Sequence, residues 1–482
     1  MTPQTPQHTP VEETLRRLIY EKYIAPTERP KKACAGLEFE LPVVNLDKKP
    51  VDFSVVHALT DAFLSRFDFS NVLRDDNGDI YNATDPGTGD CLSYDCSFNT
   101  LEFSFGIDED LSDIYDRFCR YYSFIQDFLL PRRHTLTGMG LNPYRHFNNN
   151  VPIANGRYRM LLHHLESYPK YPRTILFHDR PNFGLFSCAS QVQLDAQKDT
   201  LVETLNTFTR LEPVKALLFA NSPWEDFLCS RDYFWKHSMH GVNPHNVDIY
   251  DKKLTSVDEV VAYIRTMSLY CVERDEKYIN FPPTPLETYF RQDHIDGEYY
   301  DVYEGRFNKI RFIPEWEDLQ HLRSFKFDDV TFRGTIEFRS ACEQPVRDIM
   351  TVAAFQTGLM EVLPELNARL DNAGFLYDQG YSYLELRELL VKRRLPDFVR
   401  EEDLEVLLGD VIDLAAEGLR RRGRGEEKFV QNLYSRAAHL MSPARVQVEG
   451  LESGVPLEYY INDYAALDWA RRHYTGRRTR PC

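Results

Sequence analysis

Four short stretches of the sequence place carboxylate, amide or guanidinium side chains at alternating positions between apolar residues. Carboxylate and amide oxygens are ligands that hard divalent cations prefer, and arginine suits phosphate. The residue types therefore predict a site for Mg²⁺ or Mn²⁺ and a phosphorylated ligand. These residues are Glu38 and Glu40 in GLEFE, Glu102 in NTLEFSF, Gln191 and Gln193 in SQVQLD, and Glu337 and Arg339 in GTIEFRS.

The alternation itself predicts four β-strands, each with one apolar and one polar face. Glu38 and Glu40 share a face, which is unfavourable for two like charges unless a cation lies nearby. For a single strand, a polar face turned to water is the commoner explanation. The four polar faces together contain no lysine, however, and they would converge if the strands shared one antiparallel sheet. Glu38, Glu40, Glu102 and Glu337 are then the candidate metal ligands.

The chemistry that such a site favours is phosphoryl transfer from ATP, which depends mainly on positioning and on neutralising charge. The sequence contains no GxxxxGK[ST] and no GxGxxG loop, and no GxSxG or HExxH motif. A nucleotide site in this chain must therefore be built from strand faces.

The bulk composition limits the partners. The chain has 482 residues and a formal net charge of −17, which disfavours nucleic acid and anionic membranes as main partners. No apolar run is long enough for a transmembrane helix, and MTPQTPQHTP lacks the apolar core of a secretory signal. The nine cysteines are scattered and never form CxxC, which favours reduced thiols and a cytoplasmic location.

The elements that must position the site predict an α+β fold. Residues 1–29 read as a polar tail followed by a helix, and residues 30–346 as a catalytic domain of strands mixed with helices. From 347 to 482 the apolar spacing is helical, so we expect a helical C-terminal region packed on the catalytic domain. Gly423 reads as a helix stop, and Ser442 as the cap of a helix with proline in its first turn.

In the order of its motifs, the chain resembles the glutamate–cysteine ligases of the plant and proteobacterial type, within the carboxylate–amine ligases. The resemblance spans about residues 30 to 465, and it implies a glutamine synthetase-like fold, in which helices cover a funnel-shaped antiparallel sheet. It also implies ATP and Mg²⁺ as cofactors, with glutamate and cysteine as small-molecule substrates joined through an acyl phosphate. The motifs are GLEFE, NTLEFSF, GMGLNPYR, NGRYRMLLHHL, SQVQLD, ALLFANSPW, RDYFW and GTIEFRS.

The resemblance also implies roles for single residues. Glu38 and Glu40 would bind metal, and Glu102 and Glu337 would complete those sites. Arg339 would contact the transferred phosphate, which makes Glu38, Glu337 and Arg339 the candidate catalytic residues. Gln191 or Gln193 would face metal or substrate. Arg231, four residues before Trp235, would hold the α-carboxylate of glutamate, although a surface ion pair is the alternative without the resemblance.

NGRYRM adds Arg157 and Tyr158 as candidate substrate-binding residues near the start of a helix, with Asn155 as its cap. A packed tyrosine beside a solvated arginine explains these residues equally well.

Two departures from the family pattern leave the acceptor amine open. YDCSFN stands where the family has a glycine-rich loop, and KHSMHGVNPHN follows Trp235 in place of an acidic run. The main alternative is a ligase of the same mechanism that uses another amine. Guanidino phosphotransfer and a non-enzymatic cation-binding protein are the more distant alternatives, and the sequence leaves the oligomeric state undefined.

Overall fold

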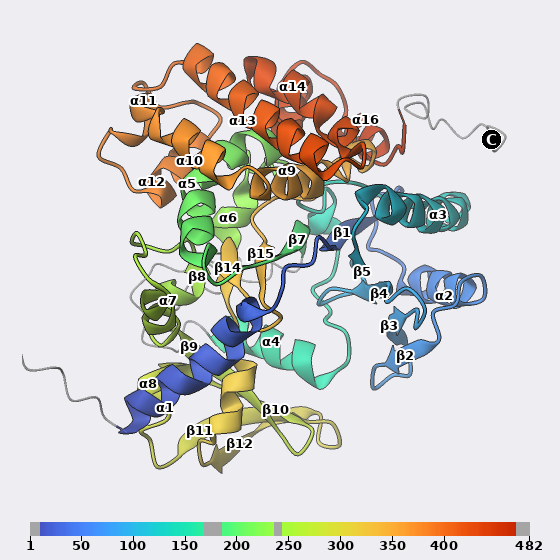
Figure 1. The fold of residues 1–482 in the computed structure, drawn as a ribbon. Helices are drawn as coiled ribbons and strands as arrows, with labels where there is room; N and C mark the ends of the chain where they lie inside the picture. The colour runs from blue at the N-terminus through green and yellow to red at the C-terminus, as the bar shows by residue number, and fades with distance from the viewer. Residues whose placement is uncertain (1–9, 168–185, 236–242, 469–482) are drawn as a thin grey trace, which may run out of the picture.

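The fold is built around a large antiparallel sheet, seen in a computed structural model that describes residues 10–167, 186–235 and 243–468. Within these residues, nine strands pair in the order β14-β15-β7-β1-β5-β4-β3-β2, with β6 beside β1 (Figure 1). The strands are β1 (Ala35–Asn45), β2 (Asn71–Arg74), β3 (Ile80–Thr84), β4 (Cys91–Tyr94), β5 (Thr100–Asp108), β6 (His134–Leu136), β7 (Ser190–Asp195), β14 (Asp328–Val330) and β15 (Thr335–Phe338).

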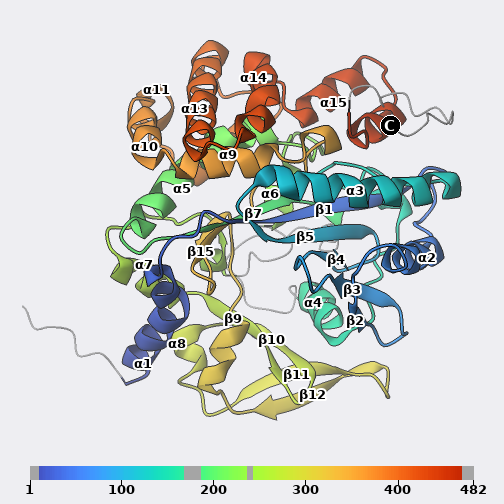
Figure 2. The same cartoon turned by 45° about the vertical axis from the view of Figure 1, so that its right-hand side comes forward.

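Strands β15, β7, β1 and β5 are the four that the alternating pattern predicts, and they are consecutive neighbours in the sheet. Their apolar side chains are buried, as Phe39, Phe103, Val192 and Ile336 illustrate. This face packs against α3 (Leu111–Leu129) and α9 (Thr351–Met360), which lie over the sheet in Figure 2. The opposite face therefore carries the polar residues, because side chains alternate along a strand. The α+β class and the helix-covered antiparallel sheet are confirmed.

A second, four-stranded sheet lies on the other side of the large sheet from the C-terminal helices (Figures 1 and 2). It consists of β9 (Ser268–Arg274), β10 (Lys277–Pro285), β11 (Ile295–Asp301) and β12 (Arg306–Phe312). A short parallel pair joins β8 (Val247–Asp248) to β13 (Phe325–Lys326).

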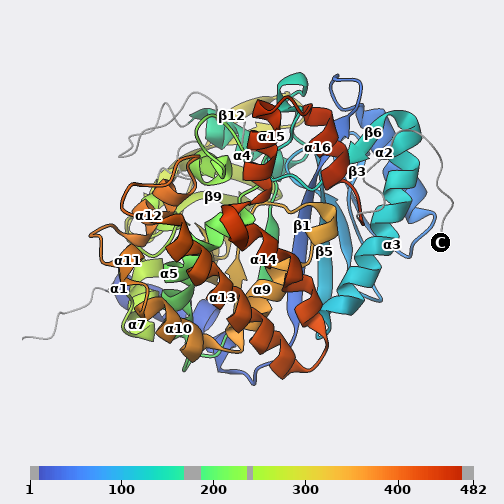
Figure 3. The ribbon, with the colours of Figure 1, turned by 90° about the horizontal axis from the view of Figure 1, so that it is seen from above.

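After β15 the described chain is helical, as the apolar spacing predicts, and these helices cover the sheet when it is seen from above (Figure 3). Gly423 ends α13 in the left-handed conformation at φ 71°, and the Ser442 hydroxyl caps α15. The helical spacing does not show every break, because a turn at Glu361 and Val362 separates α9 from α10. The remaining helices here are α10 (Leu363–Asp371), α11 (Gly374–Tyr377), α12 (Tyr383–Leu390), α13 (Glu401–Arg422), α14 (Gln431–Ala437), α15 (Pro443–Glu452) and α16 (Leu457–Tyr464).

One hydrophobic cluster runs from the N-terminal helix through the sheet into the C-terminal helices. The predicted boundary at residue 346, between the catalytic domain and the helical C-terminal region, therefore stays a prediction.

The other helices are α1 (Pro10–Ile19), α2 (Phe53–Leu64), α4 (Gly156–Ser167), α5 (Leu201–Phe219), α6 (Ser230–Phe234), α7 (Val257–Ile264) and α8 (Leu286–Tyr289). Among the described residues, every helix is too short or too polar to span a bilayer.

Candidate active site

The sheet brings the four predicted glutamates onto one face. In the antiparallel ladders, Glu40 lies opposite Glu102 on β5, and Glu38 lies opposite Gln191 on β7. Glu337 on β15 lies opposite Gln193. Residues that pair across an antiparallel ladder point to the same side of the sheet. We call the surface formed by Glu38, Glu40, Glu102 and Glu337 the acidic face.

The two glutamines orient two of these carboxylates. The Gln191 amide donates to Glu40 Oε1 at 2.8 Å, and the Ala189 backbone N–H donates to Glu40 Oε2 at 2.7 Å. The Gln193 amide donates to Glu337 Oε1 at 2.9 Å. Because their amide nitrogens donate, Gln191 and Gln193 hold neighbouring carboxylates in place here. A glutamine amide carries both a donor nitrogen and an acceptor oxygen, so either can face a neighbour.

Burial and crowding make the acidic face a poor place for uncompensated negative charge. Burial first, and then the charges of Glu102 and Glu337, raise the pKa of Glu38 to about 8. Burial and the charge of Asp95 raise the pKa of Glu40 to about 8. The pKa of Glu102 rises to about 8 for the same two reasons, with Glu40 as a further cause. Carboxylates held together in this way are a suitable donor set for hard divalent cations, which supply the missing positive charge.

Asp95 is a fifth acidic residue of this region that the sequence analysis did not assign. It follows β4, whose Ser93 lies opposite Glu102, so alternation along the strand places Asp95 on the same face as Glu102. Its backbone N–H donates to the Thr100 carbonyl at 3.2 Å, and the Cys96 thiol donates to its Oδ1 at 3.3 Å. The sequence could have predicted Asp95 only if the register of the hairpin between β4 and β5 had been known, because that register sets which β4 residue lies opposite Glu102.

Arg339 adds a positive charge at the edge of the acidic face. Its Nη1 lies 3.2 Å from Gln191 Oε1 and 3.4 Å from Glu337 Oε2. Its Nε is buried and has no hydrogen-bond acceptor among the described residues. Arg339 therefore has donor capacity to offer to an anion beside Glu337, as the predicted phosphate contact requires.

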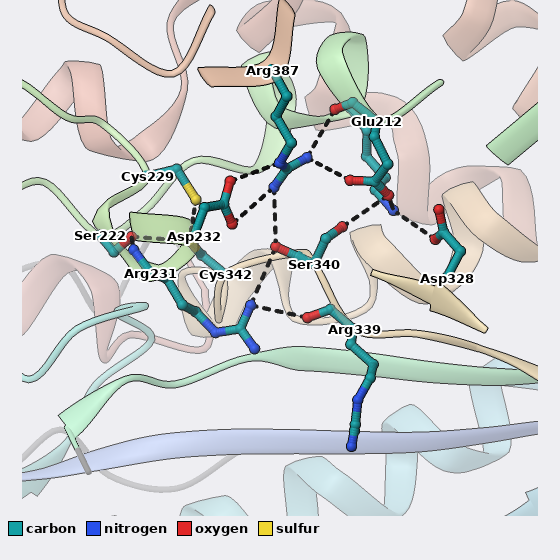
Figure 4. A network of polar contacts seen from close by, with 11 residues as sticks. Glu212, Ser222, Cys229, Arg231, Asp232, Asp328, Arg339, Ser340, Cys342 and Arg387 are labelled. Carbon is teal, nitrogen blue, oxygen red and sulfur yellow. Dashed lines mark hydrogen bonds and ion pairs between the residues drawn. The ribbon is translucent and has the colours of Figure 1, made fainter. Parts of the chain in front are cut away.

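Arg231 is buried, and only 2% of its surface is exposed. Its Nη1 donates to the carbonyl oxygens of Arg339 at 2.9 Å and of Ser340 at 3.3 Å (Figure 4). Its charge acts on Glu40, where it opposes the rise in pKa. The surface ion pair considered for Arg231 is therefore excluded. The Trp235 ring lies 4.6 Å from the Arg231 guanidinium and 5.9 Å from that of Arg339, so it packs against both cations.

Arg157 and Tyr158 are placed differently from one another. Asn155 caps α4, as predicted, by accepting the Tyr158 backbone N–H at 2.9 Å. The Tyr158 ring joins the hydrophobic core, and its hydroxyl donates to the Tyr94 carbonyl at 3.3 Å. The contacts of Tyr158 match the packed tyrosine of the two alternatives, and its role in substrate binding stays a prediction. Arg157 is exposed, and its charge partly opposes the rise in the pKa of Glu102.

Of the two loops that depart from the family pattern, one lies largely outside the described residues. The structure describes 243–246 of the segment KHSMHGVNPHN, where Asn243 caps a short 3₁₀ turn. The other loop, YDCSFN, is described completely and contains Asp95 and Cys96, with Cys96 in the left-handed conformation at φ 58°.

Comparisons with known proteins show which proteins this chain is similar to. Curated relatives include a chloroplastic glutamate–cysteine ligase of Solanum lycopersicum, 24% identical over 324 residues, which are 65% of this chain and 56% of that protein. A chloroplastic glutamate–cysteine ligase of Nicotiana tabacum is 21% identical over 418 residues, 83% of this chain and 73% of that protein. The chain thus spans a little over half the length of the tomato relative.

Among solved structures, a glutamate–cysteine ligase of Francisella tularensis in complex with AMP aligns with 93% of this chain and 90% of its own. The identity is 11% and the TM-score 0.49, which is too low to transfer detail. The sequence profile of glutamate-cysteine ligase family 2 matches residues 34–380, and this range contains every strand of the acidic face. The chain belongs to the glutamate-cysteine ligase family 2.

Proposed function

We propose that this protein is an ATP-dependent ligase that joins the γ-carboxylate of L-glutamate to the amine of L-cysteine. The products are γ-glutamylcysteine, ADP and inorganic phosphate. The observation that carries the proposal is the acidic face, where four carboxylates from β1, β5 and β15 lie on one side of the sheet beside Arg339. Membership of the glutamate-cysteine ligase family supports the same reaction class.

The donor set on the acidic face fits Mg²⁺ or Mn²⁺, and Glu38, Glu40, Glu102 and Glu337 would hold the ions. Crowding of negative charge, which helps to raise the pKa values of Glu38, Glu40 and Glu102, favours cation binding there. When bound, such ions supply positive charge that neutralises phosphate oxygens. Gln191 and Gln193 keep the carboxylates of Glu40 and Glu337 oriented through their amide hydrogen bonds.

Arg339 and Arg231 would bind different anionic groups of the substrates. In the first step a γ-carboxylate oxygen of glutamate attacks the γ-phosphorus of ATP and ADP leaves. In the second, the unprotonated amine attacks the carbonyl carbon, the bond from that carbon to the phosphate oxygen breaks, inorganic phosphate leaves, and the nitrogen releases one proton to become the amide N–H. Arg339 would stabilise the transferred phosphoryl group, and Arg231 would hold the α-carboxylate of glutamate, with Trp235 packed against both guanidinium groups.

A second candidate is a ligase of the same mechanism with another amine as acceptor. The loop YDCSFN favours keeping this alternative, because Asp95 places an additional negative charge beside Glu40 and Glu102. An additional carboxylate would suit an acceptor with more positive charge than cysteine carries.

The test is ADP release by the purified protein with ATP, Mg²⁺ and L-glutamate across a panel of amines, with product masses determined. ADP and a γ-linked glutamate–cysteine dipeptide are expected with cysteine, and no ADP is expected from Glu337→Gln. ADP with glutamate and a different amine would replace the acceptor and keep the mechanism. ADP formed with creatine or arginine alone would favour guanidino phosphotransfer. Mg²⁺ binding without turnover of any substrate set would overturn the proposed activity.

We also propose the cytoplasm as the location of the protein. The eight cysteines in the described residues are free thiols, and five of them are buried, which suits a reducing compartment. Fractionation of cells expressing the tagged chain would test this placement.

A further inference from the structure

Arg387 lies in the C-terminal helical region, on α12, and its side chain points toward Glu212, Asp232 and Ser340 (Figure 4). It lies beyond residue 380, where the family match ends, and only 2% of its surface is exposed. A buried arginine is costly unless its charge is balanced and its donors are satisfied. The contacts of Arg387 therefore indicate what the residue does.

All five N–H donors of the Arg387 guanidinium have an acceptor. Nε and Nη2 form a two-pronged contact with the Asp232 carboxylate, at 2.7 Å and 3.2 Å. Nη1 donates to Glu212 Oε2 at 2.6 Å and to the Glu212 carbonyl at 2.8 Å. Nη2 also donates to the Ser340 carbonyl at 3.4 Å. One side chain thus joins α5, α6 and the segment after β15, which lie far apart in the sequence.

Two of these contacts constrain Arg231 directly. Asp232 is the next residue along α6, so its pairing with Arg387 holds the backbone from which the Arg231 side chain extends. The Ser340 carbonyl accepts from Arg387 Nη2 and also from Arg231 Nη1. Arg387 therefore fixes Arg231 at its backbone and, through a shared acceptor, at its guanidinium.

The charges around Arg387 are balanced within the protein. Glu212 also pairs with Lys215, and Lys215 lies 3.3 Å from Asp328. Burial would raise the pKa of Glu212, but the charges of Lys215 and Arg387 outweigh it and the pKa is lowered. Burial and the charge of Glu212 raise the pKa of Asp328 well above its usual range, and the charge of Lys215 opposes that rise. We call Arg387, Glu212, Asp232, Lys215 and Asp328 the Arg387 network.

We propose that Arg387 is a positioning residue that holds Arg231 in place to bind the α-carboxylate of the glutamate substrate. The substrate named here rests on the proposed function. The first part of the proposal, that Arg387 holds Arg231 in place, rests on the geometry alone. Lysine cannot replace arginine in this role, because it offers a single ammonium and not a planar set of five donors.

The first experiment compares the kinetics of Arg387→Lys with those of the unchanged protein. Misplacing Arg231 should raise the KM for glutamate by about 10- to 100-fold. The KM for ATP should stay within about twofold, because Arg231 does not contact the phosphates. A merely structural role would lower the active fraction and kcat and would leave the KM for glutamate unchanged, an outcome that would overturn the proposal.

Arg369→Lys is the matched control. Arg369 is also an arginine of the C-terminal helices paired with an aspartate, since its Nε donates to Asp410 Oδ2 at 2.6 Å. That pair is partly exposed and lies between α10 and α13. Both KM values should stay unchanged in this variant, and a rise in the KM for glutamate equal to that of Arg387→Lys would refute the specific role of Arg387.

Hydrogen exchange measured by mass spectrometry tests the placement of Arg231 without any activity. Peptides covering residues 229–235 should exchange about tenfold faster in Arg387→Lys than in Arg369→Lys, because α6 loses its anchor. Equal exchange would overturn the proposal. If the unchanged protein makes no ADP with glutamate, the proposed function fails, and the exchange rates still decide the placement.

Chemical rescue provides a second variant. Arg387 and Asp232 line a cavity of about 160 Å³, which gives a free guanidinium ion room to enter beside Asp232. In Arg387→Ala, millimolar guanidinium chloride should lower the KM for glutamate, and sodium chloride at equal concentration should not. Equal effects of the two salts would contradict the positioning role.

Discussion

The acidic face and the Arg387 network both gather buried or partly buried carboxylates, and they differ in what balances the charge. In the Arg387 network, Arg387 pairs with Glu212 and Asp232, and Lys215 pairs with Glu212 and Asp328. On the acidic face, carboxylates outnumber the neighbouring arginine, and the pKa values of Glu38, Glu40 and Glu102 rise. Balanced charge holds a fold together, whereas unbalanced charge in a folded protein marks a place that a ligand completes.

The difference predicts that Glu→Gln substitutions abolish activity on the acidic face. Glu38→Gln and Glu337→Gln should each lower turnover by about 1000-fold or more, because a metal ligand is lost and the phosphate charge is less well neutralised. The measurement is ADP release with ATP, Mg²⁺, glutamate and cysteine. Glu365→Gln, which removes a charge from an exposed pair with Arg421, is the matched control. Near-normal turnover in either site variant would remove that residue from the site.

The same substitution in the Arg387 network should instead lower stability. Glu212 is fully buried between Arg387 and Lys215, so Glu212→Gln leaves two buried cations without their full partner. We expect the free energy of unfolding to fall by about 3 kcal/mol, measured by urea titration. For Glu365→Gln the change should be within about 0.5 kcal/mol. If Glu212→Gln and Glu365→Gln unfolded at the same urea concentration, the balanced network would not be structural.

Arg231 lies between the two regions, and its replacement should affect one substrate. Arg231→Lys should raise the KM for glutamate by about 100-fold, because lysine cannot make the paired contacts of arginine with a carboxylate. The KM for ATP should remain unchanged. Initial-rate kinetics with each substrate varied separately make the distinction, and equal changes in both KM values would argue against a role in glutamate binding.

The smallest effect expected is a pH dependence of the metal-free protein. The folded-state pKa values of Glu38, Glu40 and Glu102 are raised from an ordinary 4.5 to about 8. In that window the folded protein binds more protons than the unfolded chain, so stability falls as the pH rises towards 8. The Tm measured in EDTA should therefore drop between pH 5 and 8.

Mg²⁺ should reverse that drop and release protons when it binds at pH 7, because it requires ionised carboxylates. Calorimetry in buffers of different ionisation enthalpy measures the proton release. The Glu38→Gln variant should show a weaker pH dependence. A flat Tm across this range in the unchanged protein would contradict the crowding of charge on the acidic face.

Much of the site could be predicted from single strands. The alternation in GLEFE and NTLEFSF separates Leu37 and Phe103, which are buried, from Glu38 and Glu102, which share the polar face. Helix ends could also be predicted from neighbouring residues alone, as the cap at Asn155 shows. For Tyr158 the local sequence left substrate binding and packing open, because its hydroxyl bonds to the Tyr94 carbonyl, 64 residues away.

Local pattern was enough to say which side chains share a face of one strand, because side-chain direction alternates with a period of two residues. Strand order and hairpin register decided that Glu40 lies opposite Glu102 and that Asp95 joins them, and these depend on pairing over long separations. Arg387 shows the limit most clearly, since its partners Glu212 and Asp232 lie 175 and 155 residues away. A contact over such a distance leaves no local signal, because only the packing of α5, α6 and α12 brings the three side chains together.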